Sequence, residues 1–136
     1  MNLPFEPFDQ LVQLQQSVTD SFCKLASDTV DRKGIFRVSL SGGSTPKRVY
    51  EMLAQRDLPW QQIHWFWGDE RNVPKDHADS NFRMVHTALL GPVGAPEANI
   101  HAVPVDDAKP ATAAKAYAAT MPNHYQGKWT DFDLVL

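Results

Sequence analysis

The chain has 136 residues, of which 13 are basic and 16 are acidic, so its formal net charge is −3. A chain of this length forms one ordinary domain and buries a sizeable core. Hydrophobic residues make up 43% and charged residues 21%, close to average globular usage, which disfavours disorder and coiled coil. The mildly acidic balance argues against a general nucleic-acid-binding protein, which usually carries a basic excess.

The cysteine content and the N-terminus indicate a compartment. One cysteine, Cys23, excludes an intrachain disulfide framework and fits a reducing environment. Residues 1–10 carry Glu6 and Asp9 but no basic residue, which is unlike a secretory signal or a transit peptide. No apolar run approaches the roughly 18 residues that a membrane span requires. We therefore expect a cytoplasmic protein with no membrane partner.

The first part of the chain predicts a helix, a strand and a second helix. Gly34 is expected to end the first helix. The apolar residues of that helix recur with helical spacing, at Phe8, Leu11, Val18, Phe22 and Leu25. Residues 35–40 form a short β-rich run that predicts a strand. In the second helix Thr45 is expected as the N-cap and Pro46 as the first helical residue, with the helix ending near Arg56.

The rest of the chain continues this alternation. Residues 63–67 predict a second strand that is apolar on both faces apart from His64, as in a sheet covered by helices on both sides. Asp79 or Ser80 is expected to cap a third helix after a polar loop. Further on, the sequence predicts a strand at 100–105, an Ala-rich helix at 109–121 that Pro122 breaks, and a strand at 132–136.

This order predicts an α/β fold, a three-layer Rossmann-like, mostly parallel sheet with helices on both faces. The sheet is expected to be incomplete at the C-terminus, because residues 132–136 are a strand with nothing after it. In open parallel sheets the ligand site lies beyond the carboxyl ends of the strands, so a loop after Leu136 would belong to it. We therefore expect residues 1–136 to be the N-terminal part of a single α/β domain.

The first candidate site is the segment Ser41, Gly42, Gly43, Ser44 and Thr45 after the first strand. Two glycines let the backbone turn tightly and approach a ligand, and three hydroxyls add donors. The helix that follows points its free N–H groups and its positive dipole end at the same place, which suits a phosphate. The spacing matches neither a P-loop nor a dinucleotide fingerprint. Phosphate binding and a simple strand-to-helix turn therefore both remain open from the local pattern.

The second candidate site is the segment Asp69, Glu70 and Arg71, directly after the second strand. The planar guanidinium of Arg71 suits a phosphate or a carboxylate. The alternative is a solvated loop in which Arg71 pairs with Glu70 or Asp79. Both candidate loops follow strands and would face the same edge of the sheet, so their conjunction is better evidence for a site than either loop separately.

A metal centre is not indicated. His77 lies between Asp76 and Asp79, but these residues do not fall at a recognised ligand spacing such as H-E-x-x-H. Cys23 is far away, in the first predicted helix. We expect capping and turn roles for this loop.

Three stretches taken together resemble the 6-phosphogluconolactonases. They are Ser41-Gly42-Gly43-Ser44-Thr45-Pro46, then residues 67–74 with the sequence WGDERNVP, then Asp79-Ser80-Asn81. Their order and spacing match along most of the chain, from the first helix to Leu136. The wider superfamily includes the glucosamine-6-phosphate isomerases, which typically carry Asp-Glu-Tyr where Asp69-Glu70-Arg71 stands here. Arg71 thus favours the lactonase branch.

The resemblance implies hydrolysis of 6-phospho-D-glucono-1,5-lactone to 6-phosphogluconate in the oxidative pentose phosphate pathway, with no metal or organic cofactor. The implied partner is a small-molecule sugar-phosphate lactone, and the oligomeric state stays open. The family's Gly-x-Asp-Gly-His segment, whose histidine is the proposed general base, would follow a strand like residues 132–136 and is absent from this sequence. We therefore expect the 136-residue fragment to be inactive and to be unstable or associate through an exposed apolar patch.

Roles for the named residues follow from the resemblance as hypotheses. Residues 41–45 and Arg71 would clamp the substrate phosphate. Asp69 would lie nearer the sugar and orient the ring or the missing base, and Glu70 would hold Arg71 or the loop. Lactone hydrolysis also needs a base that activates water and donors for the developing oxyanion.

Two other functions use the same features. One is a glucosamine-6-phosphate isomerase or deaminase, in which Asp69 abstracts a proton next to a carbonyl. The other is a non-catalytic sugar-phosphate sensor domain, which a fused DNA-binding segment would favour; no basic helix-turn-helix precedes Phe8. The lactonase ranks above the isomerase, and the isomerase above the sensor.

Overall fold

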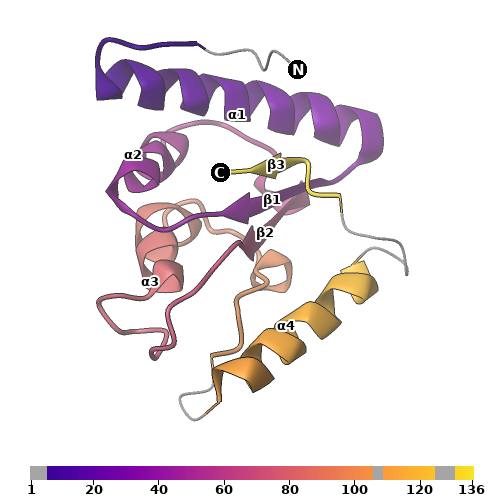
Figure 1. The fold of residues 1–136 in the computed structure, drawn as a ribbon. Coiled ribbons are helices and arrows are strands. Elements are labelled where there is room, and N and C mark those ends of the chain that lie inside the picture. The colour runs from indigo at the N-terminus through magenta and orange to yellow at the C-terminus, as the bar shows by residue number, and fades with distance from the viewer. Residues whose placement is uncertain (1–5, 106–108, 125–130) are drawn as a thin grey trace, which may run out of the picture.

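The computed structural model describes residues 6–105, 109–124 and 131–136. In this part of the chain, three parallel strands form one sheet in the order β2-β1-β3 (Figure 1). The strands are β1 (Phe36–Leu40), β2 (Ile63–Trp67) and β3 (Leu134–Val135). In the register, Phe36 lies opposite Ile63 and Val38 lies opposite both Trp65 and Leu134. The α/β class and the parallel sheet predicted from the sequence are confirmed.

Helices cover the sheet. The longest are α1 (Leu11–Lys33), α2 (Ser44–Leu53) and α4 (Pro110–His124). A shorter helix α3 (Asn81–Val85) continues as one π-helical turn, η2 (His86–Leu90), and 3-10 turns occupy Trp60–Gln62 and Glu97–Asn99. Figure 1 shows α1 and α4 on opposite sides of the sheet. This arrangement matches the layered architecture that the strand–helix alternation predicts.

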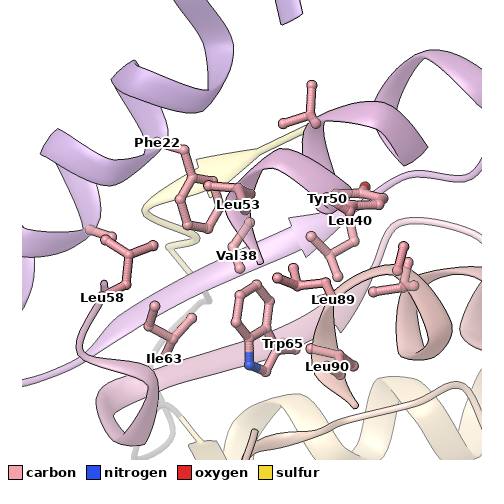
Figure 2. Packing of buried hydrophobic residues seen from close by; sticks show 14 of the residues in the cluster. Phe22, Val38, Leu40, Tyr50, Leu53, Leu58, Ile63, Trp65, Leu89 and Leu90 are labelled. Carbon is pink, nitrogen blue, oxygen red and sulfur yellow. The ribbon is translucent and has the colours of Figure 1, made fainter. Parts of the chain in front are cut away.

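The main core lies between the sheet and the helices α1, α2 and η2. Every second residue of the two long strands points into it, at Phe36, Val38, Leu40, Ile63, Trp65 and Trp67. The rings of Phe22 and Trp65 stack at 6.2 Å between centroids, and Figure 2 shows Phe22 next to Leu53 and Trp65 next to Leu89. Period-2 burial on this face explains why β-rich, apolar runs at these positions become strands.

The helix α1 ends where the sequence predicts, but only part of the predicted stripe is buried: Phe22 lies in the core and Val18 packs against it. Gly34 adopts φ 76°, and its N–H bonds to the carbonyl of Val30, as expected of a left-handed C-cap. The buried side chains are Gln15, Thr19, Phe22, Ala26 and Thr29, whereas Leu11 and Leu25 of the predicted stripe are exposed. The reason is that α1 packs on α2 partly through polar contacts, including a bond from Gln15 Nε2 to the carbonyl of Thr45.

The prediction that Thr45 caps α2 is wrong. The helix begins two residues earlier than predicted, at Ser44 instead of Pro46, and its N-cap is Gly43 with φ 102° and ψ 168°. A residue without a Cβ reaches that conformation at little cost, so the turn is made by glycine rather than by a capping hydroxyl. Ser44 and Thr45 consequently lie in the first helical turn, and Pro46 occupies the third position, where no backbone N–H is needed. Regular α2 ends at Leu53, before the expected Arg56.

The predicted strand at 100–105 is also wrong. Only Ile100 forms a bridge, to Trp65, and the next amide donates to the Trp65 carbonyl. Beyond it the Val105 N–H bonds to the carbonyl of Val103, which closes a tight turn around Pro104. Proline has no N–H to give to a strand ladder, so the chain leaves the sheet here.

The last two predicted elements shift their bounds. The helix α4 continues to His124, although Pro122 was expected to break it. A proline removes one helical hydrogen bond, and the cost is small here because only two helical residues follow it. The last strand shortens to Leu134–Val135, although Leu136 still donates its N–H to the carbonyl of Ser39.

Candidate active site

The two candidate loops meet at the carboxyl ends of β1 and β2, as the sequence predicts. The first loop begins at Ser41, whose backbone is held by the hydroxyl of Tyr50 on α2. That hydroxyl accepts from the Ser41 N–H at 3.1 Å and donates to the Ser41 carbonyl at 2.8 Å. Burial raises the pKa of Tyr50 to about 12, so the hydroxyl keeps its proton and makes both bonds at neutral pH.

The side chain of Ser41 is engaged inside the fold. Its hydroxyl donates to the carbonyl of Leu136, just beyond the end of β3. Ser44 and Thr45, by contrast, are exposed in the first turn of α2, beside its free N–H groups. Among the three hydroxyls of the loop, those of Ser44 and Thr45 are therefore the ones that face solvent.

A carboxylate organises the second loop. Glu70 Oε1 accepts the backbone N–H groups of Arg71 at 2.7 Å and Asn81 at 2.8 Å, and Oε2 accepts that of Phe82 at 2.8 Å. Ser80 caps α3, as predicted, by accepting from the Arg83 N–H. Glu70 thus ties the loop to the N-terminus of α3, where a negative charge is favoured by the helix dipole. The expectation that Glu70 holds the loop is confirmed.

A second tyrosine fixes the end of β2. The Tyr117 hydroxyl, on α4, accepts from the Trp67 N–H at 2.9 Å and donates to the Trp67 carbonyl at 3.2 Å. Burial raises the pKa of Tyr117 as well. Each strand end that leads into the site is therefore held by a tyrosine from a helix.

The two loops enclose a pocket of about 370 Å³. It is lined by Gly43, Ser44, Lys47, Arg71, Ala78, Asp79, Ser80, Asn81 and Met84. Neither Lys47 nor Arg71 forms an ion pair with a residue that the structure describes, so the alternative in which Arg71 pairs with Glu70 or Asp79 is not observed. Two cations beside a helix N-terminus favour an anion in this pocket.

A second pocket, of about 510 Å³, shares Arg71 with the first. Asp69, Glu70 and Arg71 form its polar wall, and its apolar wall comes from α4 and from residues 103–105. Asp69 is exposed, and its Oδ1 accepts from Asn81 Nδ2 at 3.4 Å. The described residues that line these two pockets include no histidine.

The loop around His77 makes the kind of turn contact that the sequence predicts. Nowhere in 6–105, 109–124 or 131–136 do three or more His, Cys, Asp or Glu side chains gather as a metal ion would need. His77 Nδ1 accepts the backbone N–H of Asp79 at 3.1 Å, a turn contact. Within the same ranges, no helix has both the length and the apolarity to cross a bilayer.

Lys47, Tyr50, Asn81 and Tyr117 are the site residues to which sequence reasoning gave no role of their own. Tyr50 lies three residues before Leu53, on the same helical face, and that spacing is a signal for its burial. Lys47 falls one turn after Gly43 at the start of a helix, a position from which a cation reaches the loop. The sequence carries no comparable signal for the contact between Tyr117 and Trp67.

Comparison with known proteins identifies the class to which this fold and pocket belong. A family model described as glucosamine-6-phosphate isomerases/6-phosphogluconolactonase matches residues 9–136, and the chain belongs to that family. The chain is 44% identical over 131 residues to the 6-phosphogluconolactonase of Nostoc sp., and the match covers 94% of this chain and 54% of that protein. With the 6-phosphogluconolactonase of Synechocystis sp. it shares 46% identity over 110 residues, covering 79% and 46%.

Solved structures agree with the sequence matches. The crystal structure of 6-phosphogluconolactonase from Thermotoga maritima superposes with a TM-score of 0.75 at 33% identity, covering 89% of this chain and 53% of that one. A 6-phosphogluconolactonase from Shewanella baltica superposes with a TM-score of 0.82 at 25% identity, covering 94% and 53%. The chain therefore spans about half the length of the relatives that it matches.

Proposed function

We propose that this chain supplies the phosphate-binding part of a 6-phosphogluconolactonase, which hydrolyses 6-phospho-D-glucono-1,5-lactone to 6-phosphogluconate. The observation that carries the proposal is the pocket in which Arg71 and Lys47 stand beside the N-terminus of α2. The names of the relatives support the reaction, because two relatives that are 44% and 46% identical to this chain are named 6-phosphogluconolactonases.

In this proposal the pocket holds the phosphate, and its cations offset the double negative charge. The free N–H groups at the start of α2 and the exposed hydroxyl of Ser44, which lines the pocket, add donors. Thr45 is exposed in the same helical turn but lines a different pocket, together with Ser41 and Gly42. Gly43, which lines the pocket, lets the backbone come close to the ester, while Gly42 packs against Asn81. The hydroxyl of Ser41 donates to the Leu136 carbonyl, and its backbone N–H and carbonyl are both bonded to Tyr50, so Ser41 would support the loop rather than contact the phosphate. A phosphate fixed here orients the lactone for reaction, which converts binding energy into rate.

Asp69 lines the second pocket next to Arg71, which lines both pockets, and we assign Asp69 the task of orienting the ring or the general base. The carboxylate is exposed and beside Arg71, so a sugar attached to the bound phosphate would reach it. Hydrolysis also needs a base near neutral pKa. With no histidine among the described lining residues, that base is expected from another part of the enzyme, and the 136-residue chain alone is expected to be inactive.

The test is a chimera that replaces the matching segment of the Nostoc relative with residues 1–136. We expect the chimera to release 6-phosphogluconate from the lactone faster than the spontaneous reaction, while the 136-residue chain alone does not. Production of fructose 6-phosphate and ammonia from glucosamine 6-phosphate would instead support the isomerase. Phosphosugar binding without any turnover would support a sensor domain and contradict the proposal.

The clamp makes a specific prediction for Arg71. In the chimera, Arg71→Ala should raise KM for the lactone by about 10- to 100-fold, because a charge-assisted contact to phosphate is worth about 1.5–3 kcal/mol. Steady-state kinetics measure the effect. Arg48→Ala is the matched control, since Arg48 pairs with Glu51 on the exposed face of α2 and lines neither pocket. An unchanged KM in Arg71→Ala would contradict the clamp.

A further inference from the structure

Asn81 lies between the two loops of the site. It is the first residue of α3, and only 6% of its surface is exposed. Its backbone N–H is fixed by Glu70, so the side chain leaves the helix from a defined point. A buried amide in such a position is expected to form hydrogen bonds with particular neighbours.

On one side the Asn81 side chain fills the space against Gly42. A Cβ built on Gly42 would overlap Asn81 Oδ1, and would lie 2.6 Å from Cγ and 2.9 Å from Nδ2. Real Cβ atoms do not approach other heavy atoms this closely, so Gly42 and Asn81 determine each other's place. The contact sets how closely the first loop, residues 41–45, approaches the start of α3.

On the other side the same amide donates to Asp69. Nδ2 lies 3.3 Å from the Asp69 carbonyl oxygen and 3.4 Å from its carboxylate Oδ1. Both the backbone and the side chain of Asp69 are therefore within reach of one donor group. The Asn81 side chain therefore contacts both the first loop, at Gly42, and the Asp69 carboxylate.

We propose that Asn81 is a positioning residue, which holds the Asp69 carboxylate at a fixed place relative to the phosphate clamp. The inference rests on the proposed function, because it needs Asp69 to act on a substrate anchored at residues 41–45. Small displacements of a reacting group cost rate, so the effect of losing Asn81 falls on kcat rather than on the phosphate contacts.

The test uses the chimera with three variants: Asn81→Ala, Gly42→Ala and the double variant. Asn81→Ala removes the three atoms nearest to a Cβ at Gly42 and also removes the donor to Asp69. We expect kcat to fall about 10- to 100-fold with KM changed less than about threefold. Asn81→Asp, which keeps the shape and loses the donor group, should lose kcat in the same way.

The other two variants separate the steric contact from the hydrogen bonds. Gly42→Ala alone should lower the thermal midpoint and raise KM strongly. In the double variant, the thermal midpoint and KM should return toward the values of Asn81→Ala, while kcat stays low. The positioning role is overturned if Asn81→Ala lowers kcat and raises KM to a similar extent. It is also overturned if the double variant does not recover the thermal midpoint and KM lost in Gly42→Ala. Either result leaves the lactonase proposal intact.

Failure of the proposed function has a different signature. If the unaltered chimera turns over only glucosamine 6-phosphate, the lactonase proposal is wrong, and the kcat and KM of that reaction still decide the role of Asn81. If it turns over neither substrate, both proposals that assign Asp69 a part in catalysis are overturned.

Discussion

The two loops of the site are held in place by different forces. The first loop, residues 41–45, is fixed by neutral contacts: the Tyr50 hydroxyl clamps Ser41, and Gly42 packs against Asn81. The second loop, residues 68–80, is fixed by the charge of Glu70, which accepts three backbone N–H groups at 2.7–2.8 Å. One loop therefore depends on shape, and the other depends on a carboxylate.

This difference explains which side chains of each loop remain free to contact a ligand. Because Glu70 is occupied by backbone amides, it does not neutralise Arg71, and the guanidinium remains exposed in the pocket. Because Tyr50 satisfies the backbone of Ser41, the hydroxyls of Ser44 and Thr45 are not needed to shape the turn. The supporting groups and the proposed ligand groups are thus different residues, which lets each be tested separately.

The largest expected effect comes from removing the carboxylate. Glu70→Ala in the chimera leaves backbone donors of Arg71, Asn81 and Phe82 without their partner. Hydrogen bonds to a charged group contribute about 1.5–3 kcal/mol each, and water replaces some of them, so we expect a loss of about 3 kcal/mol. Denaturant unfolding measures it through the midpoint at constant slope. Glu70→Gln, which keeps one acceptor oxygen, should lose less.

The matched control is Glu51→Ala on α2. Glu51 forms a surface ion pair with Arg48, which is worth about 0–1 kcal/mol. If Glu70→Ala costs no more than Glu51→Ala, the second loop does not depend on its carboxylate, and the contrast between the loops is wrong.

The scaffold that carries these loops was largely predictable from local sequence. The strand 63–67 was predicted with its observed bounds, since an apolar run between a turn and a polar loop leaves little choice. Gly34 ends α1 as predicted, and Ser80, one of the two predicted caps, begins α3, because caps depend on single residues. Placing both loops at one sheet edge followed from the parallel order alone.

The contacts inside the site were not predictable in the same way. Thr45 looked like a cap, but the left-handed conformation of Gly43 started the helix first. The strand predicted at 100–105 failed because Pro104 turns the chain after a single bridge. The roles of Asn81 and Tyr117 depend on partners 12 and 50 residues away, and one sequence does not show which residues will meet.

A smaller effect should separate the two tyrosines. Tyr50 is fully buried, so Tyr50→Phe leaves the N–H and carbonyl of Ser41 without a partner, and we expect a loss of about 1–2 kcal/mol. Tyr117 is half-buried on α4, so water can replace its hydroxyl at Trp67, and Tyr117→Phe should lose less. Unfolding of both variants in the chimera gives the comparison. Equal losses of unfolding free energy in the two variants would show that burial does not determine how much each tyrosine hydroxyl stabilises the fold.

The smallest expected effect is an alkaline one, and it tests the neutral clamp directly. The pKa of Tyr50 is about 12 in the folded protein, above the ordinary value of 10. Above pH 10 the unfolded chain loses the hydroxyl proton while the folded protein keeps it, so unfolding becomes easier as the pH rises. The stabilisation is complete below pH 10 and falls by about 1.4 kcal/mol per pH unit until the folded pKa is reached.

The stability difference between the unaltered chimera and Tyr50→Phe isolates this contribution, because all other titrating groups are common to both. We expect that difference to shrink by about 1 kcal/mol between pH 9.5 and pH 11. Tyr117→Phe serves as the second comparison, since burial raises the pKa of Tyr117 in the same direction. A difference that stays constant over this range would mean that Tyr50 ionises in the folded protein as readily as in the unfolded chain. The Tyr50 hydroxyl would then give the first loop no proton-dependent stabilisation.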